Sequence, residues 1–83
     1  MSTLYTMNAT KPATKTALVK AGRALGRQYK GTGIDEAALT DIADQEVRKI
    51  PGIPLEDGTP DLSSIQFDYF YGAAQKAAGV KQD

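Results

Sequence analysis

The residues best suited to chemistry are cations that recur along one stretch near the start of the chain. They are Lys20, Arg23, Arg27 and Lys30. Because neighbours in this set are three or four residues apart, they share one face if the stretch is helical. Such a face neutralises phosphate groups, in contacts that weaken as salt rises. We therefore predict an anion or nucleic-acid contact here, and a weak, non-specific one, because no stacking aromatic accompanies the cations.

Other patterns that resemble reactive sites have simpler structural explanations. The chain contains no histidine and no cysteine, which removes the commonest general base, the commonest transition-metal ligands and any disulfide. Oxygen-bearing side chains in residues 57–68 follow a calcium-loop register, but Leu62 occupies the turn position that needs glycine. We therefore expect no enzyme activity, no cofactor and no metal site, and we identify no small-molecule substrate.

The ten basic and ten acidic residues balance in number but are separated along the chain. Residues 1–33 contain six basic and no acidic residues, whereas residues 34–61 contain eight acidic and two basic ones. The acidic stretch argues against a helix-turn-helix reader of DNA, because phosphates would repel its second helix. The short turn at residues 30–33 predicts that the two stretches lie side by side and partly neutralise each other.

Hydrophobic spacing predicts three helices, at residues 12–29, 35–50 and 60–78. In the first, Gly22 and Gly26 lower helix propensity but leave a flat strip that another backbone can approach closely. The second begins at Asp35, whose carboxylate can accept backbone N–H groups of the first turn.

The third helix is expected to follow a loop. Residues 51–60 hold three prolines and two glycines, and Thr59-Pro60 is typical of a helix start. Residues 63–71 also alternate like a strand, but no convincing second strand exists to pair with them. The predicted fold class is all-α, a small three-helix domain over residues 12–80, with a mobile N-terminal arm at 1–11 and a C-terminal tail at 81–83.

The third helix is apolar on two faces, since four of the six aromatic residues lie between positions 67 and 71. One face completes a predicted core of Leu18, Leu25, Tyr29, Leu39, Ile42, Val47, Ile50, Leu62, Ile65 and Tyr69. The other exceeds what so short a chain needs, so we predict that it contacts a protein partner or a second copy. The predicted interface residues are Phe67, Phe70, Tyr71, Ala74 and Ala78.

These expectations combine into a non-catalytic structural or protein–protein interaction subunit, a small component of a larger homo- or hetero-oligomeric assembly such as a virion. The alternative is an accessory or regulatory protein that binds nucleic acid weakly and non-specifically through the basic face of helix 12–29. The sequence shows no long apolar segment and no signal-peptide pattern, so we expect no membrane contact and a cytoplasmic location, or a virion if the protein is viral.

Overall fold

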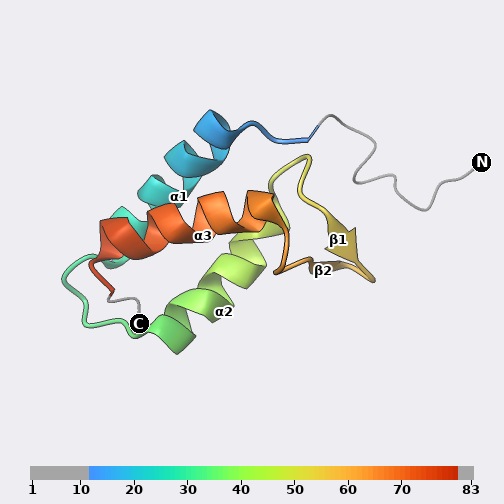
Figure 1. Cartoon of the computed structure of the whole chain (residues 1–83). Helices are drawn as coiled ribbons and strands as arrows, with labels where there is room; N and C mark the ends of the chain where they lie inside the picture. Colours follow the sequence, from blue (N-terminus) through green and yellow to red (C-terminus); the bar gives the residue numbers. More distant parts are fainter. Residues whose placement is uncertain (1–11, 81–83) are drawn as a thin grey trace, which may run out of the picture.

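The computed structural model describes residues 12–80, and these form three helices and one small hairpin (Figure 1). The elements in chain order are α1 (Lys15–Tyr29), α2 (Glu36–Val47), β1 (Leu55–Glu56), β2 (Thr59–Pro60) and α3 (Ile65–Ala78). The predicted all-α fold class is confirmed. The predicted arm at 1–11 and tail at 81–83 lie outside the described residues. Within residues 12–80, every helix is too short or too polar to cross a membrane.

Each helix begins at a polar side chain that accepts a backbone N–H from its first turn. Thr14 does this for α1 at 3.2 Å, Asp35 for α2 at 2.8 Å and Ser64 for α3 at 3.1 Å. Such caps satisfy donors that have no partner inside the helix. The cap predicted at Asp35 is confirmed, whereas the first and third helices begin later than predicted, at Lys15 and Ile65.

A two-stranded antiparallel hairpin replaces the predicted start of the third helix. Thr59 and Pro60 form β2 and pair with β1, so they do not cap and open a helix. The two strands are joined by Asp57 and Gly58, which both adopt positive φ, of 52° and 81°. An Asp-Gly pair is favoured in two-residue hairpin turns because both central positions need this conformation. The helix that follows therefore lacks its predicted first turn.

The segment between β2 and α3 is held by Asp61. Its carboxylate accepts hydrogen bonds from the hydroxyl of Ser63 at 2.7 Å and from the backbone N–H of Ser63 at 3.1 Å, and these bonds hold the pKa of Asp61 below its ordinary value. Asp61, one of the residues in the calcium-loop register, thus stabilises a local turn through its carboxylate. Among residues 12–80, no three acidic side chains gather in a way that could hold a metal ion.

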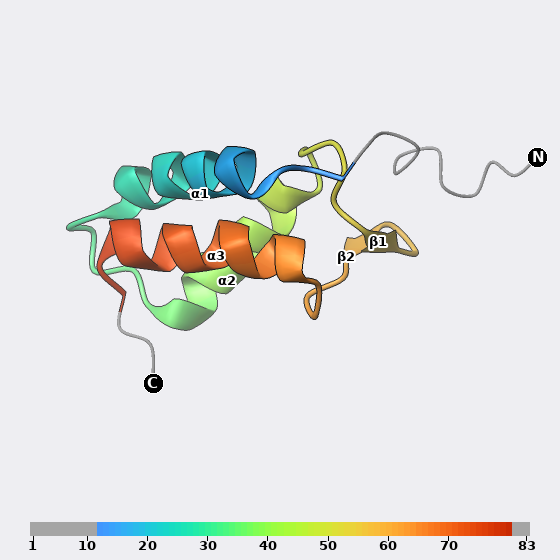
Figure 2. The same cartoon turned by 45° about the horizontal axis from the view of Figure 1, so that its top comes forward.

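The helices α1 and α3 run parallel and in close contact (Figure 2). A Cβ atom added to Gly22 would lie 2.2 Å from the carbonyl oxygen of Phe70, and one added to Gly26 would lie 2.3 Å from that of Ala74. These glycines therefore set the distance between the two helices, because only a residue without a side chain admits a neighbouring backbone so closely. The flat strip predicted from the sequence is the contact surface of α1 with α3.

The core agrees with the prediction on α1 and α2 and differs on α3. The predicted residues Leu18, Leu25, Leu39 and Val47 are buried, and Tyr29, Ile42, Ile50 and Tyr69 are partly buried against them. The sequence also predicts Leu62 and Ile65 in the core, but they are 49% and 62% exposed. Leu62 lies before α3, and Ile65 is its first residue. Phe67, two positions further on, is buried, so Ile65 is exposed because of the side of α3 on which it lies.

Candidate functional site

The predicted partner interface on α3 lies inside the protein. Phe67, Phe70, Ala74 and Ala78 are 4%, 2%, 0% and 8% exposed and belong to the core of this chain. The two apolar faces of α3 are both used because α3 packs against α1 and against α2. The inference of an external partner at these residues is therefore corrected, since a single chain already covers them.

The fifth residue of that set, Tyr71, joins two helices of the same chain. Its hydroxyl lies 2.5 Å from the hydroxyl of Thr40 and donates a longer hydrogen bond, 3.3 Å, to the backbone carbonyl of Glu36. Its ring stacks on that of Phe67 at a centroid distance of 5.5 Å. Tyr71 thus holds α3 against the first half of α2 and is half-buried by doing so.

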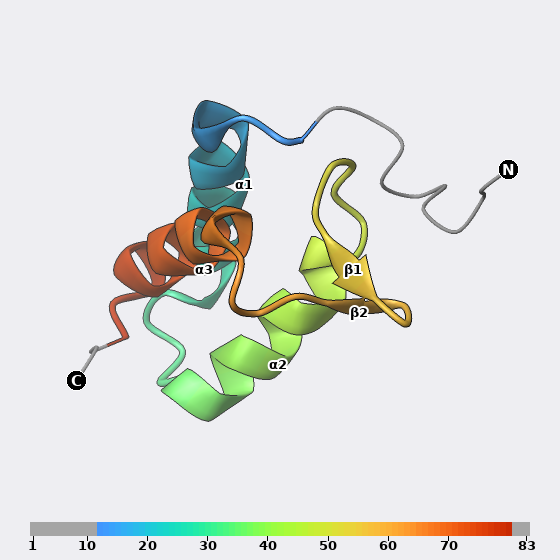
Figure 3. The same ribbon diagram turned by 45° about the vertical axis from the view of Figure 1, so that its right-hand side comes forward.

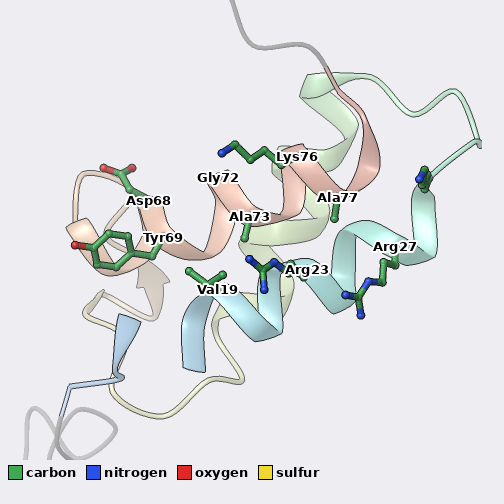
Figure 4. A pocket seen from close by; sticks show the side chains of 10 residues that line it. Val19, Arg23, Arg27, Asp68, Tyr69, Gly72, Ala73, Lys76 and Ala77 are labelled. Atoms are coloured by element: carbon green, nitrogen blue, oxygen red, sulfur yellow. The ribbon is translucent and has the colours of Figure 1, made fainter. Parts of the chain in front are cut away.

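An open groove of about 640 Å³ lies at the surface between α1 and α3 (Figure 4). Cationic side chains from both helices border it, and small residues of α3 line the stretch between them. The lining residues are Val19, Arg23, Arg27, Lys30, Asp68, Tyr69, Gly72, Ala73, Lys76 and Ala77. All four cations in this set are exposed.

Three of the four cations predicted to contact an anion lie in this groove, namely Arg23, Arg27 and Lys30. The fourth, Lys20, borders a separate shallow hollow on α1, which Arg23 also lines. The sequence pattern missed Lys76, which reaches the groove from α3. The sequence pattern that could have indicated Lys76 is its spacing: Asp68, Gly72 and Lys76 are four residues apart and therefore share one helix face. Nothing in that spacing shows that the face borders α1.

The charges of the groove are not neutralised by the acidic helix. The ion pairs found within residues 12–80 are both local to the end of α2: Arg48 with Asp44 at 3.6 Å, and Lys49 with Glu46 at 3.2 Å. The predicted pairing between the first two helices is therefore absent from the described part of the chain. The reason is that α1 packs on α3 and not alongside α2, as Figure 3 shows.

One end of the groove has a different chemistry from the rest. Asp68 and Tyr69 lie there, toward the start of α3, and Arg27 lies toward the other end (Figure 4). Asp68 is exposed, and Tyr69 is half-buried with the ammonium of Lys15 at 5.1 Å from its ring centroid. The sequence predicts a core position for Tyr69, so it does not indicate that an aromatic ring accompanies the cations.

Comparison of the chain with family models, with curated proteins and with solved structures finds no match. A function must therefore be inferred from the residues of the groove and their chemistry.

Proposed function

We propose that this chain is a non-catalytic accessory protein that binds nucleic acid along the groove between α1 and α3. The proposal is supported by the convergence of cations from two helices on one open surface. Arg23, Arg27, Lys30 and Lys76 all border it, and none forms an ion pair with another residue between 12 and 80. Unpaired, exposed cations are the groups that neutralise a phosphate backbone and release its counterions.

The spacing of the cations suits a ligand with regularly repeated negative charges. Arg23 and Arg27 are one turn apart, which corresponds to about 6 Å along the axis of α1, and Lys30 follows on the next turn. Arginine also binds phosphate oxygens through two parallel N–H groups, which gives orientation as well as attraction. A single small anion could be bound by one guanidinium group, whereas a row of cations along α1 matches a chain of phosphates.

The zero net charge of the protein does not contradict this proposal, because the acids are concentrated elsewhere. Exposed carboxylates such as Asp41 lie on α2, which packs against α3 and away from the groove cations of α1. Fields from exposed charges are screened within about 8 Å at physiological ionic strength. The groove therefore acts as a local cationic surface, and we expect modest, strongly salt-dependent affinity.

The test is the double variant Arg23→Gln with Arg27→Gln, measured by fluorescence anisotropy with a labelled oligonucleotide. We expect affinity at low salt to fall about tenfold or more, and the slope of log affinity against log salt to become shallower by roughly 1.5, because two phosphate contacts are lost. Glutamine keeps helix propensity close to that of arginine, so the fold should be retained. Circular dichroism checks that retention.

The matched control is Arg48→Gln with Lys49→Gln, which changes net charge equally but lies outside the groove. These two cations already pair with Asp44 and Glu46, so the control should bind as the parent does. Equal losses in both double variants would show that overall charge, and not the groove, governs binding. An unmodified protein with no affinity for oligonucleotides at low salt would refute the proposal.

A second candidate function is that of a structural subunit assembled through charged faces. It is favoured because basic and acidic residues lie on different helices in the folded chain. The cations of α1 form no ion pair within residues 12–80, and α2 carries exposed acidic residues such as Glu36 and Asp41. If the acidic face of one copy meets the basic groove of another, the contact runs head to tail and closes into a ring or continues as a filament.

For this second candidate we expect the mass measured by light scattering to exceed that of a monomer at low salt and to fall as salt rises, because exposed charges are screened. Arg23→Gln with Arg27→Gln should abolish the association without unfolding the chain. A monomer at low salt, at concentrations where charged contacts are strongest, would exclude assembly through these faces.

A further inference from the structure

The two ends of the α1–α3 groove call for different groups on one ligand. Arg27 lies toward the end of the groove away from Asp68, where phosphates are attracted, and Lys76 borders the middle of the groove (Figure 4). At the other end the exposed carboxylate of Asp68 forms no ion pair with another residue of the described chain, so it repels a phosphate. A continuous row of phosphates therefore does not match the whole groove. A nucleic-acid ligand, whose charged groups are phosphates, must therefore place an uncharged group beside Asp68.

The neighbouring ring of Tyr69 indicates that this group is flat. Tyr69 lines the groove and is only half-buried, and its hydroxyl forms no hydrogen bond with another residue between 12 and 80. Aromatic rings beside a cationic track are the usual stacking platforms for unpaired bases. The ammonium of Lys15 lies over this ring, 5.1 Å from its centroid, so a base that stacks on the same face takes the place of that cation.

Asp68 gives this end a preference among bases. A carboxylate accepts hydrogen bonds, so it pairs with the exocyclic amino group of cytosine, adenine or guanine, whereas thymine offers it only one ring N–H between two carbonyl oxygens that it repels. Asp68 also lies in the first turn of α3, where an acid favours the helix dipole. The helix dipole alone would explain why an acidic residue occupies this turn. It would not make the preference among bases depend on Asp68, so the two explanations can be told apart.

We propose that the groove selects single-stranded nucleic acid and receives one unpaired, amino-bearing base at Tyr69 and Asp68, an inference that rests on the proposed nucleic-acid binding. In a duplex the bases are paired and stacked and do not reach such a site. A strand is favoured over a free nucleotide because the groove is open along α1, whereas sites for small molecules enclose most of their ligand.

The experiment compares labelled oligodeoxycytidylate, oligothymidylate and a mixed-sequence duplex, each of about 12 nucleotides. We expect the cytidylate strand to bind most tightly and the duplex most weakly. Tyr69→Leu should weaken binding of the cytidylate strand about tenfold, the expected loss for one stacked base, and leave duplex binding unchanged. Tyr69→Phe, which keeps the ring, should bind as the parent does.

Asp68→Asn is the second variant, and it keeps the test open if Tyr69→Leu fails to fold. The side chain of Asp68 is exposed, so its replacement leaves the core intact. An amide also donates hydrogen bonds, so the preference for cytidylate over thymidylate should shrink or reverse, while stability changes little. An unchanged preference would assign Asp68 to the helix dipole alone and overturn the base assignment.

The remaining outcomes separate the inference from the proposed function. Equal affinity for strand and duplex, insensitive to Tyr69→Leu, would overturn the inference and leave nucleic-acid binding in place. Full displacement of the strand by an equal concentration of adenosine triphosphate would show that a free nucleotide is the ligand, and would also overturn it. Failure of every oligonucleotide to bind at low salt would refute the proposed function itself.

Discussion

Phe70→Ala is expected to lower the free energy of unfolding by about 3–5 kcal/mol. Phe70 is 2% exposed and is among the largest fully buried side chains. Its removal loses the transfer free energy of the ring and leaves a cavity that the close α1–α3 contact prevents from collapsing. A chain of this size is stabilised by roughly 4–12 kcal/mol in total, so the variant should be partly or largely unfolded. Urea denaturation followed by circular dichroism measures the change.

The control for this prediction is Ile65→Ala, in the same helix. Ile65 is 62% exposed, so its truncation should change stability by about 0.5 kcal/mol or less. We expect the folded form of each variant to have the same molecular mass in solution as the parent protein. A Phe70→Ala variant with an unchanged urea midpoint but a smaller oligomer would restore Phe70 to a partner interface and contradict its place in the core.

The number and type of the helices were predictable because they depend on local signals. Periodic apolar residues, the cap at Asp35 and the glycine that ends α3 all act within a few residues of where they stand. Gly79, with a φ of 79°, ends that helix at the predicted residue, Ala78. A start is less certain when two local signals compete. Thr59-Pro60 resembles a helix start, but Asp57-Gly58 directly before it is the stronger hairpin signal, and the hairpin forms.

The faces of α3 were not predictable from periodicity, because both are apolar. Which face is inside depends on where the neighbouring helices lie, and that is set by contacts between residues far apart in the chain. The sequence predicts a partner interface at Phe67 and Phe70, on the expectation that one buried face is enough for a helix of so short a chain. In the fold, the small residues of α1 let α3 approach so closely that α3 is covered on two sides, and no apolar excess remains at Phe67 and Phe70.

Only the α1 side of the candidate groove was predictable from the sequence, for the same reason. Arg23 and Arg27 share a face of α1, and helical spacing alone places them together. Lys76 and Tyr69 come from α3 and join that face only through the parallel packing of the two helices. Their position beside the cations depends on the tertiary packing of the two helices. The residue spacing within either segment therefore does not indicate it.

The parallel packing itself gives the last prediction, that Gly22→Ala combined with Gly26→Ala destabilises the protein by about 4 kcal/mol. Overpacking costs up to about 3 kcal/mol at each site, because the atoms in the way, the carbonyl oxygens of Phe70 and Ala74 at 2.2 and 2.3 Å, belong to a backbone. Replacing glycine by alanine inside a helix returns about 1 kcal/mol per site. Steric cost therefore exceeds the gain in helix propensity, and thermal and urea unfolding measure the net result.

Gly72→Ala is the matched control, since it makes the same substitution inside a helix where nothing crowds the new atom. No heavy atom within 4 Å would meet a Cβ at Gly72, so only the gain in helix propensity remains, and stability should rise by about 0.5–1 kcal/mol. The same chemical change thus has opposite signs at the two places. If Gly22→Ala with Gly26→Ala were also stabilising, α1 and α3 would have to lie further apart than the contacts at Gly22 and Gly26 indicate, and the groove between them would lose its geometry.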